Sequence, residues 1–385
     1  MQERESRKEL VVDASHLETL IQALAARGYT VVGPRLRDGA IVYETISSAQ
    51  DLPAGYVDRQ EKATYRLEKK DGAGYFSYTV GPQAWKKFLH PPELKLFQAN
   101  RNGKTFEIVP LRENVPKYAF LGVRSCELHA IHIQDRVFMA GSYVDTHYQR
   151  RREQAFIVAV NCTRAGGTCF CVSMNTGPRA DGGYDLALTE IIESGRHDFL
   201  VEIGSERGEA IMQQIPGRPA SEADLLQAQQ RIAAAERQMG RHLDTTGLKD
   251  LFYQNYEHPN WAEVAGRCLS CANCTMVCPT CFCTTVEDVT DLTGTVAERW
   301  RRWDSCFTMD FSYIHGGSVR ATPASRYRQW ITHKLASWQD QFGTSGCVGC
   351  GRCITWCPVG IDITEEAAAL RNSAAKNHQK TETGV

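Results

Sequence analysis

The sequence predicts an α/β (α+β) N-terminal domain with a mixed sheet, followed by a mostly helical domain that carries most of the cysteines. Strand-like and helix-like segments alternate over roughly the first 210 residues. From Pro219 the composition changes to Ala, Gln, Glu and Arg, and eleven of the 15 cysteines lie between Cys268 and Cys357. At 385 residues, the chain is long enough for two or three compact units.

The first elements follow from the spacing of apolar residues. Glu9–Val12 is typical of a strand, and Ser15 can cap a helix that ends at Gly28. The apolar positions of this helix have helical spacing and are Leu17, Leu20, Ile21 and Leu24. Further strands are predicted at Tyr29–Val32, Ala40–Glu44, Thr64–Glu68, Tyr75–Val80, Phe106–Val109 and Tyr118–Val123.

Two cysteines follow predicted strands closely. Tyr118–Val123 leads into a predicted helix over Glu127–Met139, with Cys126 between them. The all-apolar run Phe156–Val160 is typical of a strand buried on both faces, and Cys162 comes soon after it. Because ligands tend to sit at the carboxyl ends of strands in such sheets, both cysteines are candidate site residues.

The boundaries of the chain's parts come from changes in composition. Ser221 with Asp224 resembles a capping box, which predicts a long exposed helix that bridges the two domains. The final residues are polar with almost nothing apolar, which predicts a flexible tail. We therefore divide the chain into an N-terminal domain, a connecting helix, a cysteine-rich domain and a tail, at residues 1–215, 216–245, 246–370 and 371–385.

Composition and charge exclude several classes of protein. The formal net charge is −1, which gives no electrostatic case for a nucleic-acid or membrane-surface partner. The longest apolar runs are far short of the roughly 18 residues that a membrane helix needs. The charged segment Met1–Lys8 is followed by no signal-type apolar stretch. We expect a soluble, cytoplasmic protein with no nucleic-acid or membrane partner.

The pattern C-x2-C-x2-C-x3-C-P occurs twice, at Cys268–Pro279 and at Cys347–Pro358. Two-residue gaps wrap the backbone around one 4Fe–4S cubane, and the fourth cysteine of each run ligates the other cluster. One cluster is then predicted on Cys268, Cys271, Cys274 and Cys357. The other is predicted on Cys347, Cys350, Cys353 and Cys278. Zinc is the alternative, because it commonly uses C-x2-C pairs, but it has no use for the third and fourth cysteines at this spacing.

This pattern predicts a split, bacterial-type two-cluster ferredoxin module. In compact bacterial ferredoxins the two runs are separated by a few dozen residues or fewer, whereas 68 residues lie between Cys278 and Cys347 here. An insert of that length can pack over the clusters or meet a partner.

Seven cysteines lie outside the two runs. Four occur within 46 residues, and they could hold a third cluster, be buried apolar thiols, or bind zinc: Cys126, Cys162, Cys169 and Cys171. The tetrapeptide Thr168–Cys171 recurs at Thr280–Cys283. We expect Cys281, Cys283 and Cys306 to pack beside the clusters, where they would tune the reduction potentials.

Motifs for organic cofactors and for catalysis are missing from the sequence. It has no P-loop, no G-x-G-x-x-G after a strand, no HExxH and no nucleophile elbow. We therefore expect no flavin or nicotinamide on this chain.

Several longer segments carry a family resemblance that spans the chain from about Val11 to Ile363. They are Tyr78–Pro92, Gly122–Ala130, Asn161–Cys171, Ser173–Pro178, Asp185–Glu190 and Trp303–Cys306. With the two cysteine runs, they resemble the beta subunit of soluble cytoplasmic nickel–iron hydrogenases, also called sulfhydrogenases. They are also similar to the related electron-transfer subunit of anaerobic sulfite reductase.

The resemblance implies a subunit that relays electrons and is not itself catalytic. In the hydrogenase branch, it lies between the hydrogenase small subunit, which accompanies the large subunit, and a diaphorase subunit that binds flavin and NAD(P). In the sulfite reductase branch, it feeds a sirohaem subunit. The resemblance also makes Cys126, Cys162, Cys169 and Cys171 the best candidates for a third site, although Cys169-x-Cys171 is too tight for the ferredoxin template.

Two other functions remain open from the sequence. The chain could reduce polysulfide or another sulfur compound at an incompletely ligated cluster or at Cys306. It could also be a redox sensor, although sensors usually expose one labile cluster. Four cysteines on each cluster leave no open iron, which favours electron transfer.

Overall fold

The structure is a computed structural model and describes residues 8–110, 115–193 and 195–383. The charged residues 1–7, on which the expectation of no export signal rests, lie outside the described residues, as do residues 384–385. No helix in the described ranges is long and apolar enough to cross a membrane.

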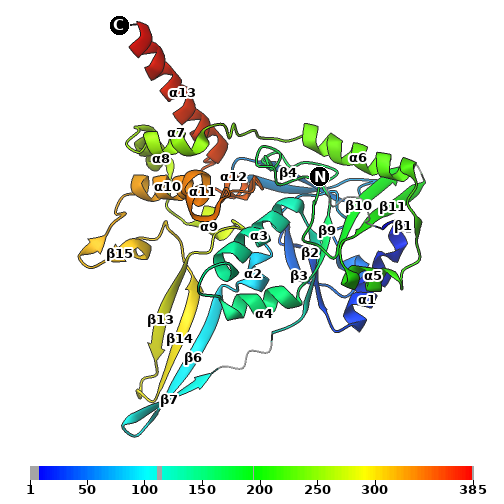
Figure 1. Cartoon of the computed structure of the whole chain (residues 1–385), viewed down its shortest axis with the longest axis horizontal. Coiled ribbons are helices and arrows are strands. Elements are labelled where there is room, and N and C mark those ends of the chain that lie inside the picture. Colours follow the sequence, from blue (N-terminus) through cyan, green and yellow to red (C-terminus); the bar gives the residue numbers. More distant parts are fainter. Residues whose placement is uncertain (1–7, 111–114, 194, 384–385) are drawn as a thin grey trace.

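An eight-stranded mixed sheet organises the N-terminal half (Figure 1). In spatial order its strands are β12 (Arg218–Pro219), β1 (Glu9–Asp13), β11 (Arg196–Ile203), β10 (Leu186–Glu193), β9 (Phe156–Val160), β8 (Tyr118–Val123), β2 (Thr30–Arg37) and β3 (Ala40–Thr45). The four central strands β10, β9, β8 and β2 run parallel to their neighbours in that group, and the outer pairs are antiparallel. The predicted mixed sheet is confirmed.

Helices cover both faces of this sheet because side chains alternate along each strand. Phe156, Val158 and Val160 share one core with α1 (Leu17–Ala26) and α5 (Glu206–Met212). Ile157 and Ala159 join the core on the opposite face. The helices on that face are α2 (Lys86–Leu89), α3 (Ser125–Met139) and α4 (Thr146–Gln154). All five residues of β9 are buried, as the all-apolar run predicts.

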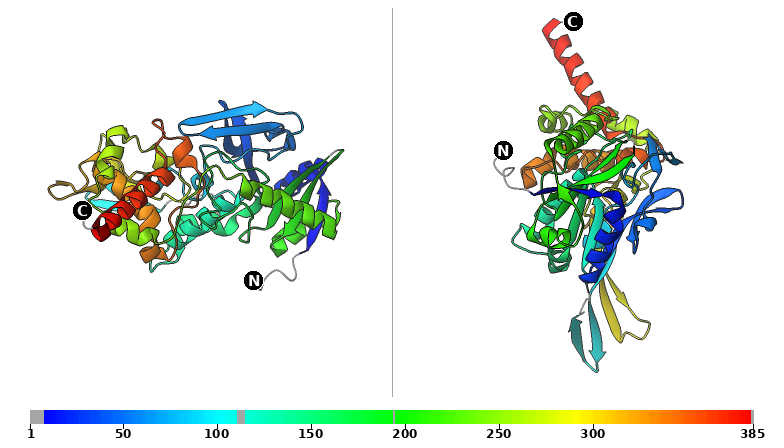
Figure 2. Two further views of the ribbon diagram at one scale, coloured as in Figure 1. Left: turned by 90° about the horizontal axis from the view of Figure 1, so that it is seen from above. Right: turned by 90° about the vertical axis from the view of Figure 1, so that its right-hand side faces the viewer.

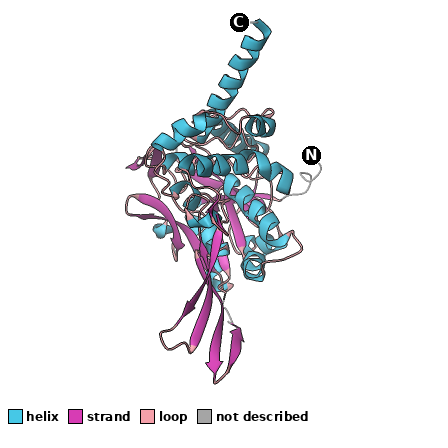
Figure 3. Cartoon of the chain, turned by 90° about the vertical axis from the view of Figure 1, so that its left-hand side faces the viewer, coloured by secondary structure: helices cyan, strands magenta, loops and turns pink. Residues whose placement is uncertain are grey.

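A four-stranded antiparallel sheet projects from this body as an arm, in the direction opposite to the C-terminal helix α13 (Figures 1 and 3, and the right-hand view of Figure 2). Its strands are β13 (Thr284–Thr290), β14 (Val296–Trp303), β6 (Glu93–Asn102) and β7 (Thr105–Pro110). The sequence places β6 and β14 in different domains, yet they pair along most of their length. The insert between the cysteine runs is therefore joined to the N-terminal part by a shared sheet.

The C-terminal part is mostly helical, as predicted. Its helices are α7 (Leu248–Gln254), α8 (Asn260–Arg267), α9 (Asn273–Met276), α10 (Pro323–Thr332), α11 (Trp338–Phe342), α12 (Arg352–Thr355) and α13 (Ile363–Thr383). A π-helical turn, His333–Ser337, joins α10 to α11. Buried aromatic residues of several elements form its core, namely Phe252, Trp261, Phe307, Tyr327 and Trp330.

The remaining elements are short, apart from the bridging helix. Two hairpins are β4–β5 (Tyr56–Glu61 and Thr64–Lys69) and β15–β16 (Tyr313–Ile314 and Gly317–Ser318). Single 3-10 turns lie at Ala14–His16, Ala49–Asp51 and Asp310–Ser312. The bridging helix α6 (Glu222–Arg237) begins with the predicted capping box, in which Ser221 and Asp224 bond each other's backbone N–H.

Three local predictions are wrong. Tyr75–Val80 forms no strand, because buried carboxylates take its backbone N–H groups: Glu190 accepts from Tyr75 and Phe76, and Asp58 accepts from Thr79. The N–H groups need no ladder partner once side chains satisfy them. The predicted flexible tail from Arg371 instead continues helix α13 to Thr383. Asp13, not Ser15, caps the first helical turn.

Candidate metal centre

The two cysteine runs fold into the same loop twice. The residues two and four positions after each first cysteine adopt left-handed backbone angles, with φ of 50° and 65° at Ser270 and Ala272, and 63° and 74° at Gly349 and Gly351. The backbone N–H of Ser270 lies 3.4 Å from Cys268 Sγ, and that of Gly349 lies 3.5 Å from Cys347 Sγ. Each loop then enters a four-residue helix, α9 or α12. The repeated spacing thus has a repeated backbone.

The fourth cysteine of the second run joins the first three of the first run. One cavity is lined by Cys268, Cys271 and Cys274 together with Cys357, and Cys353 also reaches its wall. The backbone N–H of Ile361 donates to Cys357 Sγ at 3.3 Å. The crossing that the spacing predicts is therefore present in the arrangement of these side chains.

The reciprocal group forms around Cys278. Burial raises the pKa of Cys347 to about 12, and burial together with the nearby Cys347, Cys350 and Cys278 raises the pKa of Cys353 well above its usual range. These thiols are close enough to affect one another's charge, with Cys278 from the first run among them. A buried thiol group of this kind stays protonated on its own and becomes thiolate when a metal centre supplies positive charge.

The first cavity has the chemistry that a 4Fe–4S cluster needs. Its walls are apolar apart from the thiols, and Tyr327 and Trp330 also line it. The Tyr327 hydroxyl and the Trp330 indole N–H are buried and have no hydrogen-bond partner in the described part of the chain. Buried donors normally find an acceptor, and cluster and thiolate sulfurs accept such bonds. Among the described residues, no three His, Cys, Asp or Glu side chains are grouped so as to hold a single metal ion.

A buried lysine contacts the second group. Lys334 lies in the π-helical turn and is 5% exposed; its Nζ is 3.2 Å from Cys278 Sγ and 3.0 Å from Thr280 Oγ1. Burial lowers the pKa of Lys334, but the thiolates of Cys278, Cys281 and Cys347 outweigh it and raise that pKa well above its usual value. Lys334 would thus place a positive charge beside a cluster on Cys278. Sequence reasoning missed this role, because a lysine 56 residues from Cys278 carries no local signal.

The four N-terminal cysteines also come together. Cys126 lies in the first turn of α3, Cys162 follows β9, and Cys169 and Cys171 lie on the next loop. Burial raises the pKa of Cys169 to about 12, with Cys162 and Cys350 adding to the rise. Burial raises the pKa of Cys126 well above its usual value, and Cys350, Cys171 and Cys162 contribute. The predicted third set of thiols is one buried group, and Cys350 of the second run borders it.

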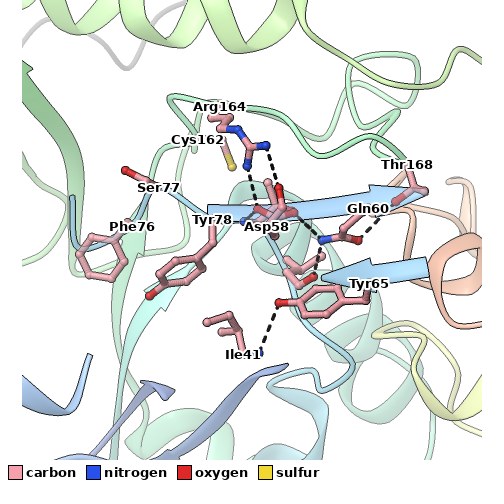
Figure 4. Close-up of polar contacts among 12 residues, drawn as sticks. Ile41, Asp58, Gln60, Tyr65, Phe76, Ser77, Tyr78, Cys162, Arg164 and Thr168 are labelled. Atoms are coloured by element: carbon pink, nitrogen blue, oxygen red, sulfur yellow. Dashed lines mark hydrogen bonds and ion pairs between the residues drawn. The ribbon is translucent and has the colours of Figure 1, made fainter. Parts of the chain in front are cut away.

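A buried carboxylate holds the loop that carries Cys162 and Cys169 (Figure 4). The Asp58 carboxylate is 1% exposed as a residue and accepts from Arg164 at 3.0 Å and from Gln60 at 2.8 Å. Arg164 also donates to the Asp58 carbonyl at 2.7 Å. Arg124 approaches the thiol itself, with Nη1 3.8 Å from Cys162 Sγ. Charged groups therefore fix this loop on the side away from the second cysteine run.

The opposite side of the same loop docks on the second run. The backbone N–H of Phe170 donates to the Gly349 carbonyl at 2.8 Å, and the hydroxyls of Thr168 and Thr355 lie 2.7 Å apart. The three thiol groups therefore follow one another in space: the N-terminal group, the group around Cys278, and the cavity with Cys268. Such an order is suited to passing electrons from one end to the other.

Gly351→Ala is expected to disturb this docking. A Cβ at Gly351 would lie 2.4 Å from the Thr168 carbonyl oxygen, and the residue has φ of +74°. The left-handed angle costs an alanine about 1–2 kcal/mol, and overpacking against backbone adds about 1–3 kcal/mol. Chemical denaturation and iron content should both show the loss.

Gly343→Ala is the matched control. Gly343 has φ of +67°, but no atom of the described residues lies within 4 Å of its Cβ position. It should lose only the cost of the backbone angle and should keep its iron. Equal losses of stability and iron in the two variants would contradict the docking described above.

Comparisons with known proteins agree with this arrangement. Residues 267–361 match the family model described as a 4Fe-4S dicluster domain, and both cysteine runs lie within that span. Sulfhydrogenase 2 subunit beta from Pyrococcus furiosus is 32% identical to this chain over 324 residues, which cover 83% of this chain and 92% of that protein. No solved structure matches the chain.

Proposed function

The chain belongs to the family of sulfhydrogenase beta subunits, and from that premise we propose that it relays electrons inside a multisubunit nickel–iron hydrogenase. It would take electrons at one end from the hydrogenase small subunit, which accompanies the large subunit, and pass them at the other end to a flavin- and NAD(P)-binding diaphorase subunit, or the reverse. No flavin or nicotinamide is proposed for this chain itself.

One observation carries the proposal: Cys357 of the second run lines the cavity of the first run. That crossing interlocks the two sites. We propose that Cys268, Cys271, Cys274 and Cys357 hold one 4Fe–4S cluster and that Cys347, Cys350, Cys353 and Cys278 hold the other. When bound, each cluster supplies a one-electron carrier. The chain's own residues ligate the irons through four thiolates each and exclude water from the sites.

The four N-terminal cysteines complete the proposed path. Their burial, their number and their contact with Cys350 support a third 4Fe–4S cluster on Cys126, Cys162, Cys169 and Cys171. Cys350 would then stand between the second and third clusters, so electrons would cross a short protein gap there.

Cys162→Ser tests this third cluster. We expect iron to fall by about four per chain, because one whole 4Fe–4S cluster is lost. EPR signals of the other two clusters should remain. Circular dichroism of the variant serves as the folding control. Unchanged iron in a folded variant would return these thiols to a packing role, and the loss of one zinc in place of iron would make the site structural.

A pure relay should also be inert by itself. In the complex, hydrogen is expected to reduce the clusters, which can be followed by their EPR signals. The isolated full-length chain, supplied with dithionite and polysulfide, should not turn over. Steady sulfide production by the isolated chain would contradict the relay and would assign it a reaction of its own.

A further inference from the structure

Three cysteines outside the proposed ligand sets gather where the arm meets the body. Strands β13 and β14 pair Thr284 with Trp303, and the ladder ends in a bond of 2.8 Å from the Asp304 backbone N–H to the Cys283 carbonyl. This pairing brings Cys283 next to Cys306, and the two thiols are within hydrogen-bond contact of each other. Cys281 contacts Cys278 in the same way.

Two buried ammonium groups face these thiols. Lys86 is 4% exposed; its Nζ donates to the Cys281 carbonyl at 3.1 Å and lies 4.0 Å from the centre of the Trp303 ring. Lys334 lies close enough to stabilise negative charge on both Cys283 and Cys306. Neither lysine has a carboxylate partner among the described residues. Buried charges need compensation, so the negative charge here must come from sulfur.

The two thiols of the pair have unequal acidity. The hydrogen bond from Cys306, with help from Lys334, lowers the pKa of Cys283 to about 7 despite its burial. The same hydrogen bond raises the pKa of Cys306. A thiolate that accepts a hydrogen bond from a neighbouring thiol is typical of a dithiol that forms and breaks a disulfide.

The pair also borders the proposed path. Ser305, which is fully buried beside Cys306, lies with its hydroxyl 2.7 Å from that of Thr275 in helix α9, next to Cys274. On the other side, Cys281 touches Cys278. The pair is therefore close to both ferredoxin-type clusters.

We propose that Cys283 and Cys306 form a redox-active dithiol that exchanges two electrons with the neighbouring 4Fe–4S clusters. In oxidation, the Cys283 and Cys306 sulfurs form one S–S bond, two protons leave, and one electron passes to each of two clusters. Reduction reverses each step. The inference rests on the proposed function, because those clusters are the electron acceptors. The dithiol stores electrons in pairs, whereas each cluster carries one, and both hydrogen and nicotinamide exchange two.

The test poises the anaerobic holoprotein at a series of potentials, quenches it with iodoacetamide and maps the peptides by mass spectrometry. At low potential we expect both Cys283 and Cys306 to be alkylated. At high potential we expect a linked peptide pair, two hydrogens lighter, with a transition whose slope indicates two electrons. Cys283→Ser and Cys306→Ser should each abolish that transition while iron per chain and the one-electron EPR transitions of the clusters stay unchanged.

Two results would overturn the dithiol. One is that both thiols stay alkylatable at every potential at which the clusters titrate. The other is that either serine variant loses about four irons per chain, which would make these cysteines cluster ligands. Wild-type protein without iron or acid-labile sulfide would instead refute the proposed function, so the two failures are distinguishable.

Discussion

Cys350→Ser is expected to stop physiological electron flow through the complex while leaving the hydrogenase half-reaction intact. Cys350 borders both the group around Cys278 and the N-terminal thiols, so its loss affects the middle of the proposed path. Removing only an outer partner of a metal ligand lowers activity about 10- to 100-fold. Removing a ligand should therefore lower hydrogen-dependent NAD(P) reduction by at least about 100-fold.

The control for this prediction is internal to the complex. Hydrogen oxidation with a viologen dye draws electrons without the whole path, and it should stay near the wild-type rate. Parallel losses of dye-linked and NAD(P)-linked activity, in a complex that still assembles, would show that the chain does more than relay.

Glu127→Ala is expected to have the largest effect on stability. The Arg352 guanidinium is fully buried, lies between two proposed ligands and pairs with Glu127 of helix α3. It also donates to the carbonyls of Gly81 and Gln83, both at 2.9 Å. Glu127 accepts further bonds from Tyr43 at 2.9 Å and from other buried donors. This network joins the N-terminal part to the second cysteine run.

Removing Glu127 would leave a buried guanidinium without a counter-charge, which typically costs about 3–5 kcal/mol. Chemical denaturation should show that loss, and iron content should fall because Arg352 lies within the second loop. The matched control is Glu257→Ala. Glu257 is 87% exposed and pairs with Arg328 at 3.4 Å, so its removal should change stability by less than about 1 kcal/mol. A Glu127→Ala protein as stable as this control would contradict the network's role.

Local patterns in the sequence predict the parts of the molecule that depend on short spacing. The alternation of apolar residues predicts β1, α1, β8 and β9, and Ser221 with Asp224 predicts the start of α6. The cysteine spacing predicts both loops, and its template even predicts that Cys357 joins the first run.

Long-range partners could not be predicted in the same way. β6 pairs with β14 about 200 positions later, and Glu127 meets Arg352 across 225 positions. Neither contact leaves a local periodicity. The chain segment at Tyr75–Val80 has strand-like composition, but distant carboxylates of Asp58 and Glu190 bind its N–H groups and replace the ladder. The contact between Cys283 and Cys306 likewise depends on a strand pairing that the sequence does not announce.

The most direct test of the relay is the iron and acid-labile sulfide content of the anaerobically purified chain, measured beside zinc and followed by EPR after dithionite reduction. The account predicts about twelve irons, a matching amount of sulfide, no zinc, and signals from interacting one-electron centres. About eight irons would confine the path to the two ferredoxin-type runs. Stoichiometric zinc, or iron without acid-labile sulfide, would contradict the account.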